Sequence, residues 1–196
     1  MRVASHVGVV SVRRVLARVS LSALMALVVF VQGAVAMAAD NGQQLRAQAA
    51  QALQHLYVKV PGSAELGEKA EAVLVFPKIY KAGFVVGGEH GKGVLFKGKE
   101  VVGYYDISAM SVGLQAGAQM FSYALFFMNR TSLDYLAKSD GWALGSGPSV
   151  VLWDKSFASS VSTTTLSQDV FAVPFGGQGL MAGMGLEGSK ISRASP

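Results

Sequence analysis

Residues 70–96 alternate short apolar runs with proline and glycine, which is the pattern of β-strands. One run covers residues 72–76 and is followed by Pro77, a second covers 79–86, and a third begins at Gly93. Five glycines fall between positions 83 and 93, so the backbone there either takes positive φ or lies close to another backbone. We therefore expect strands in this stretch, with a Gly-Gly-Glu-His-Gly turn at residues 87–91 between two of them.

Three lysines, Lys78, Lys81 and Lys92, punctuate the same stretch. Backbone N–H groups of a glycine turn and the charges of surrounding lysines could together bind an anion. The alternative is a hairpin in which the glycines serve the geometry and the lysines are simply solvated. The local residues taken alone favour this alternative, since lysines are mostly exposed.

The first 38 residues have the composition of a secretory signal peptide. Four arginines precede an apolar segment at residues 19–31, and Ala36-Met37-Ala38 supplies an A-x-A cleavage site. We expect cleavage after Ala38, export to the periplasm or the medium, and one domain at residues 39–196. An uncleaved membrane anchor is the alternative, although Gln32 and Gly33 interrupt the apolar segment.

Removal of this segment changes the charge of the chain. The whole chain has 17 basic and 12 acidic residues, but residues 1–38 hold four of the basic ones and none of the acidic ones, which leaves a net charge of +1. A nucleic-acid partner is therefore not expected, while the lysines between positions 59 and 99 allow a local basic face. With no cysteine, the domain has no disulfide and no thiolate metal site.

Residues 43–60 repeat apolar side chains at helical spacing, including Leu45, Leu53 and Leu56, and their polar positions are rich in glutamine. We expect this amphipathic helix to pack on the sheet, with insertion into a membrane as the alternative. Pro61-Gly62 should end the helix, and Ser63 should cap a second short helix.

The rest of the chain predicts further strands and one inserted helix. Residues 93–97 and 100–107 flank Gly98-Lys99 as a hairpin, and residues 110–119 and 123–128 are explained by one long or bent strand. A short helix capped by Thr131 should cover residues 131–138. Five strands should follow, at residues 142–147, 149–153, 156–166, 170–175 and 180–191. The expected fold is α+β: a curved antiparallel β-sheet or partial barrel with an N-terminal amphipathic helix and one short inserted helix.

Motifs for catalysis are missing from this sequence. The glycine-rich stretches match neither the phosphate-binding loop nor the dinucleotide fingerprint, and no G-x-S-x-G is present. After cleavage the histidines would be His55 and His90, and neither has a partner at metal-ligand or triad spacing. We expect no enzyme activity, no cofactor and no bound metal.

Several of these segments together resemble the SYLF domain, a lipid-binding domain also found in eukaryotic actin regulators that carry Src-homology-3 or FYVE domains. The resemblance runs from about Leu45 to Ser192 and is closest to an exported bacterial branch. It rests on AVLVFPKIYKAGFVVGGEHGKGVLF, SVGLQAGAQ with FFMN, GSGPSVV, STTTL and GLMAGMGLEGSKI. It implies binding of acidic phospholipids through a basic surface and an amphipathic N-terminal helix.

The resulting hypothesis is an exported, non-enzymatic domain that binds anionic phospholipid headgroups at the membrane surface of a bacterial envelope. The alternative is a structural or protein-interaction component of that envelope, with an unknown protein partner. The residues expected to bind lipid are Lys78, Lys81, Lys92, Lys97 and Lys99, together with the helix residues Leu45, Leu53 and Leu56.

Overall fold

A computed structural model of the chain describes residues 41–83, 86–112, 117–153, 168–177 and 188–195. Residues 1–42 and 43–196 form two separate units, and the architecture given below is that of the second. Three predicted features lie outside the described residues: the signal peptide at 1–38, the strand at 156–166 and most of the strand at 180–191.

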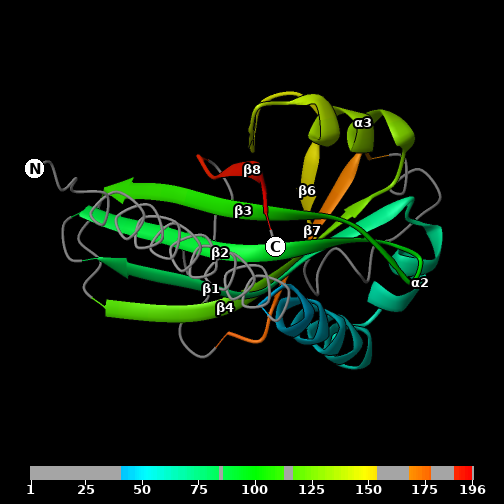
Figure 1. The fold of residues 1–196 in the computed structure, drawn as a ribbon, viewed down its shortest axis with the longest axis horizontal. Coiled ribbons are helices and arrows are strands. Elements are labelled where there is room, and N and C mark those ends of the chain that lie inside the picture. The colour runs from blue at the N-terminus through cyan, green and yellow to red at the C-terminus, as the bar shows by residue number, and fades with distance from the viewer. Residues whose placement is uncertain (1–40, 84–85, 113–116, 154–167, 178–187, 196) are drawn as a thin grey trace, which may run out of the picture. The chain divides into compact units, whose positions relative to one another are not determined.

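The described part of the chain forms one curved sheet of eight strands, in the order β5-β8-β3-β2-β1-β4-β7-β6 (Figure 1). All neighbours are antiparallel except β6 and β7, which are parallel. The predicted α+β class with a curved sheet is confirmed, with this one parallel pair added. The strands are β1 Ala72–Gly83, β2 Val86–Lys97, β3 Glu100–Val112, β4 Gly117–Phe127, β5 Trp142–Ala143, β6 Val150–Leu152, β7 Val170–Phe175 and β8 Lys190–Ala194.

Strand β1 runs through Pro77, where the sequence predicted a break. The pairing of β1 with both β2 and β4 shifts register around this proline, which marks a bulge. A bulge tolerates proline because the residue there need not donate to a neighbouring strand. The Pro77 carbonyl still accepts a hydrogen bond, of 2.8 Å, from the Ser122 hydroxyl on β4. Proline therefore offsets the register of β1 and does not end the strand.

The expected glycine turn at residues 87–91 is wrong, because these residues lie within β2 and pair with both β1 and β3. The single long strand expected over residues 110–128 is also wrong. Met110 belongs to β3 and Gly117 begins β4, and β2 and β1 lie between these two strands in the sheet. The hairpin around Gly98 is confirmed: Lys97 pairs with Glu100, and Gly98 has φ 59°.

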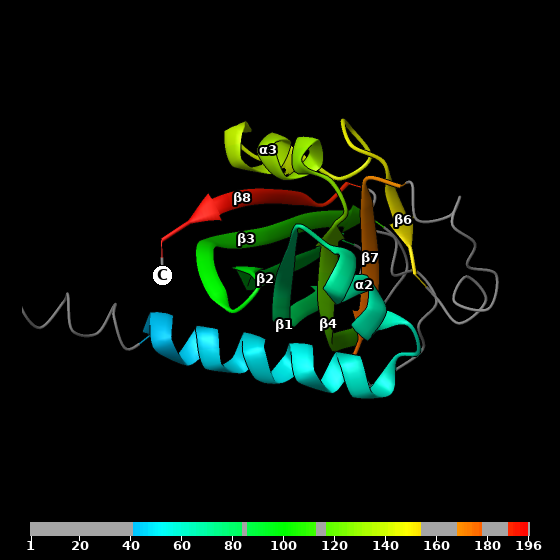
Figure 2. The same ribbon diagram turned by 90° about the vertical axis from the view of Figure 1, so that its right-hand side faces the viewer.

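Helix 41–59 packs on one face of the sheet, and α3 (Arg130–Lys138) lies on the other (Figure 2). Ala49 and Leu56 of the helix are fully buried, and Tyr57 contacts the Phe126 ring at a centroid distance of 6.5 Å. The predicted packing of the amphipathic helix on the sheet is confirmed. On the opposite face, the core contains Trp142 and is covered in part by Leu136 of α3.

Two predicted helix caps differ from the structure. Helix α2 (Ser63–Lys69) has Gly62, with φ 77°, as its N-cap, and the Ser63 hydroxyl instead donates to the carbonyls of Leu56 and Val60 at the end of the preceding helix. Helix α3 is capped by Asn129, whose side-chain oxygen accepts a 2.9 Å hydrogen bond from the Ser132 amide. In both cases the cap lies one or two residues earlier than the sequence pattern predicted.

The last third of the chain has less strand than expected. The strand predicted at 142–147 is reduced to Trp142–Ala143, because Gly145 and Gly147 take φ of 101° and 82° and turn the chain. The strand predicted at 170–175 is confirmed as β7, and the one at 149–153 is confirmed in its centre as β6. The described part of β8 begins only at Lys190 and continues to Ala194.

Candidate anion- and lipid-binding surface

The sheet face beneath helix 41–59 is covered over only part of its length. We call the part under the helix the covered half; its side chains are Val73, Val75, Val94, Phe96, Ala124 and Phe126, all buried. The same face continues beyond the helix along β1, β2 and β4. We call this continuation, together with the adjoining part of β3, the open half; its residues are Lys78, Tyr80, Ala82, Gly88, His90, Lys92, Ser108, Met110, Ala118 and Met120, all exposed.

The bulge at Pro77 determines which side chains of β1 enter the open half. Side chains alternate between the two faces of a strand, so a shift of one residue exchanges the faces. Before the bulge, the Val75 side chain lies on the sheet face that bears the helix. After the bulge, Lys78 and Tyr80 lie on this face, while Ile79 is fully buried in the core of the opposite face. The bulge thus places a lysine where the covered half has an apolar residue.

Lys78 and Lys92 are direct cross-strand partners on β1 and β2. Opposed residues of an antiparallel pair have Cβ atoms about 5 Å apart, and like charges in this position destabilise a sheet. Both lysines are exposed, and neither forms an ion pair with any described residue. The next opposed pair along the two strands is Tyr80 and His90, on the same face.

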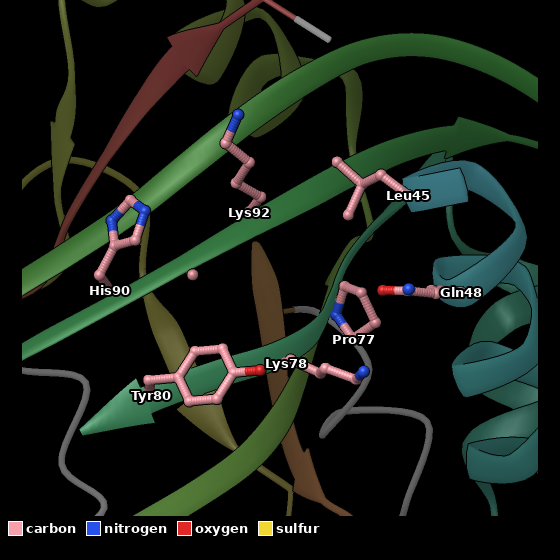
Figure 3. Close-up of a pocket in the computed structure, with 8 residues that line it drawn as sticks. Leu45, Gln48, Pro77, Lys78, Tyr80, His90 and Lys92 are labelled. Atoms are coloured by element: carbon pink, nitrogen blue, oxygen red, sulfur yellow. The ribbon is translucent and has the colours of Figure 1, made fainter. Parts of the chain in front are cut away.

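These side chains line a pocket of about 350 Å³ beside the N-terminal part of helix 41–59 (Figure 3). Helix 41–59 contributes Leu45 and Gln48, and the two strands contribute the rest: Pro77, Lys78, Tyr80, His90, Gly91 and Lys92. The pocket therefore combines an apolar wall, two lysines that form no ion pair with a described residue, and the polar atoms of a phenol, an imidazole and an amide. Such a set of groups suits an anionic group attached to an apolar body.

The structure brings together three of the eight residues predicted to bind lipid: Lys78, Lys92 and Leu45. Leu56 is fully buried, and Leu53 is partly buried against the same core, so helix 41–59 directs these two side chains to the sheet.

The three other lysines lie elsewhere in the fold. Lys97 ends β2 and Lys99 lies in the β2–β3 hairpin, at the opposite end of β2 from the glycines. Lys81 lies on the opposite face of β1, where it pairs with Glu89 of β2.

Glu89 is half-buried, and its Oε1 has no hydrogen-bond partner. Burial raises the pKa of the Glu89 carboxyl, and the nearby Lys81 ammonium lowers it in part. The pKa of the Tyr123 phenol is raised, mainly by burial and to a lesser extent by the charge of Glu89. The face opposite the pocket therefore places the half-buried Glu89 carboxyl across from Lys81.

Sequence reasoning missed Gln48, Pro77, Tyr80 and Gly91 as pocket residues, and it treated His90 as a residue of a turn. Part of this site could have been found from the sequence. If residues 78–83 and 86–92 are both taken as strands, alternation places Lys78 and Tyr80 on one face of the first strand, and His90 and Lys92 on one face of the second. The pairing of the two strands was not readable, because it depends on the bulge.

Within the part of the chain that the structure describes, no group of three His, Asp or Glu side chains is arranged to hold a metal ion. None of the described helices combines the length and the apolar character needed to cross a bilayer.

The fold is thus that of an α+β domain with two opposed lysines exposed on one face of its sheet. Residues 108–195 match the family model Ysc84, described as Las17-binding protein actin regulator. This match confirms the resemblance to the SYLF family over that range, which extends from β3 to β8, whereas Lys78 and Lys92 precede it. No curated protein matches the chain significantly.

Proposed function

We propose that this protein binds anionic phospholipid headgroups through the pocket at the open half. The observation that carries the proposal is the opposed pair Lys78 and Lys92. Both are exposed, neither forms an ion pair with a described residue, and Asp106, opposite Lys92, supplies one negative charge against the two. A phosphate group between the two ammonium groups would replace their repulsion with two attractive contacts. The apolar wall of Leu45 and Pro77 would face the glycerol and the first carbons of the lipid.

The strength of this attraction is estimated from the number of cations. A lysine near an anionic membrane surface contributes about 1 kcal/mol, so two contribute about 2 kcal/mol, which corresponds to about a thirtyfold change in partition. The attraction should weaken as salt is added, because exposed charges are screened beyond about 8–10 Å at physiological ionic strength.

The site of action that we propose is the envelope of a bacterial cell, after export. The support is the arginine-rich start, the apolar segment and the A-x-A site of residues 1–38. Mass spectrometry of the mature protein should then find a chain that begins at Ala39. A membrane-bound product that retains residues 1–38 would replace export by anchoring.

The family model is described in terms of Las17 binding and actin regulation. An exported chain meets neither partner, so we assign the lipid function and keep actin as a measurable alternative. Co-sedimentation with filamentous actin tests it directly, and binding that survives loss of Lys78 and Lys92 would favour the actin assignment over ours.

The main experiment compares two charge-matched double variants in co-sedimentation with vesicles of phosphatidylcholine and phosphatidylglycerol. Lys78→Gln/Lys92→Gln removes the opposed pair, and Lys97→Gln/Lys99→Gln removes the same charge at the β2–β3 hairpin. We expect the first to weaken binding about thirtyfold at low salt and the second to weaken it much less. Equal losses would show that only the net charge matters, and no loss in either would refute the proposal.

A further inference from the structure

The open half carries three of the exposed large apolar side chains of the described chain. Seven large hydrophobic residues of the described chain are exposed: Val58, Tyr80, Val102, Met110, Met120, Tyr135 and Leu152. Three of them share the face that bears Lys78 and Lys92. Tyr80 pairs directly with Met120 across β1 and β4, and Met110 of β3 pairs with Gly88, which lies on this face next to His90.

The four central strands arrange these groups in rows. One row contains Met110, Gly88, Ala82 and Ala118; the next contains Ser108, His90, Tyr80 and Met120; the third contains Asp106, Lys92 and Lys78. Successive rows are about 7 Å apart, since alternate residues on a strand share a face. The character of the face thus changes from apolar to amphipathic to basic within about 13 Å.

We propose that the open half is a membrane-insertion face, in which Met110, Met120 and Tyr80 enter the interfacial region of an anionic bilayer while Lys78 and Lys92 contact its phosphates. This inference rests on the proposed function and extends it from a headgroup contact to an inserted surface. It also transfers the main membrane-contacting role from helix 41–59, whose leucines pack against the sheet, to the sheet itself.

The geometry favours a bilayer over a small apolar ligand. Met110 and Met120 lie on β3 and β4, three strand spacings apart, a distance of about 15 Å. Between them the face is open at Gly88, where an added Cβ would meet no atom within 4 Å. A wide, open face with apolar groups on both sides suits a lipid surface, whereas a small ligand requires an enclosing cavity.

Charge favours a bilayer over a second copy of this chain. In a two-fold dimer the same patch meets itself, so Lys78 and Lys92 would be brought towards their own counterparts. Asp106, which pairs with Lys92 across β2 and β3, offers one acidic side chain against these two lysines. An anionic lipid surface satisfies the lysines, and it also accepts methionine and tyrosine side chains at the depth where amphipathic groups collect.

The test uses the exported protein and two pairs of substitutions matched in exposure. Met110→Ser/Met120→Ser changes side chains that are 82% and 48% exposed, and the control Val58→Ser/Leu152→Ser changes side chains that are 79% and 44% exposed elsewhere. Partition into phosphatidylcholine–phosphatidylglycerol vesicles is measured at high salt, where the lysine attraction is screened. We expect the methionine pair to lose at least about tenfold in partition, and the control to bind like the parent.

A second variant reports insertion itself. Met110→Trp should shift its fluorescence to shorter wavelength on vesicle addition and should be quenched by lipids with brominated acyl chains. Trp142 and Trp153, both buried, provide a constant background.

The outcomes separate the two proposals. One outcome overturns the insertion proposal and leaves the headgroup proposal standing. In it, vesicle binding depends on Lys78 and Lys92, the fluorescence of Met110→Trp is neither shifted nor quenched, and Met110→Ser/Met120→Ser partitions like the parent. Loss in the methionine pair without any dependence on the lysines supports insertion and refutes the headgroup function. If the parent protein binds no vesicle, both proposals are refuted. If in addition the parent is a dimer and Met110→Ser/Met120→Ser converts it to a monomer, the face is an interface with a second copy of the chain.

Discussion

The covered and open halves belong to the same face of the same strands, yet they have opposite chemistry. Under helix 41–59 the face is a close-packed apolar core, and past the bulge at Pro77 it presents lysine, histidine, tyrosine and methionine to the surroundings. The transition occurs within three residues of β1, from Val75 to Lys78. A sheet longer than the helix that covers it can therefore keep its core at one end and carry a binding surface at the other.

The comparison is tested most strongly by removing one aromatic ring from each half. Phe126 is fully buried in the covered half and Tyr80 is 57% exposed in the open half. Phe126→Ala should lower the free energy of unfolding by about 3–5 kcal/mol through loss of buried area and cavity formation. Tyr80→Ala should change it by no more than about 0.5 kcal/mol. Urea denaturation measures both, and similar losses would show that the open half is packed.

Two glycines of β2 offer a smaller contrast between tight packing and open space. A Cβ at Gly93 would lie 2.6 Å from the Phe76 ring, whereas a Cβ at Gly88 in the open half would meet nothing. Gly93→Ala should therefore cost about 1–3 kcal/mol of stability. Gly88→Ala should be neutral or should stabilise the fold by up to about 1 kcal/mol, because it lowers the entropy of the unfolded chain. Thermal melting of both variants checks the difference, and a destabilised Gly88→Ala would place another group over this face.

The smallest effect concerns the inner side of the strands that bear the open half, where Glu89 pairs with Lys81. Burial raises the pKa of Glu89 above its unfolded value, so between the two values the folded protein holds more protons. The free energy of unfolding must then fall as pH rises through this interval. Glu89→Gln should remove that dependence and raise the melting temperature at neutral pH.

A second variant controls this result. Lys81→Gln removes the cation that lowers the pKa of Glu89, so its stability should decline with pH over a wider interval than that of the parent. Melting temperatures across a pH series are the measurement. If Glu89→Gln and the parent have the same profile, the carboxylate is solvated and the inner charge pair has no role in stability.

Sequence reasoning predicted most of the elements and missed how they are joined. Period-two alternation identified the strands, and the spacing of Leu45, Leu53 and Leu56 identified the helix and its packing face. The extent of β1 and β2 was not predicted, because proline and glycine ordinarily mark turns, whereas here Pro77 lies in a bulge and residues 87–91 lie inside a strand.

The candidate site was predicted only in part for the same reason. Lys78 and Lys92 were selected by charge, but their pairing depends on a register that the bulge sets and that local sequence does not specify. Lys81 was selected with them although strand alternation sends it to the other face. The exposed methionines could not be found, since an apolar residue beyond the end of the helix has the same local pattern as one beneath it.

The central claim is that anionic lipid meets the open half and not the covered half or the hairpin. The most direct test is a titration of the ¹⁵N-labelled protein with soluble short-chain phosphatidylglycerol, followed by the amide chemical shifts of each residue. The account predicts shifts that begin past Pro77, at Lys78, Tyr80, His90 and Lys92, while Val75 and Val94 remain unchanged. Shifts confined to helix 41–59 or to the β2–β3 hairpin would contradict it.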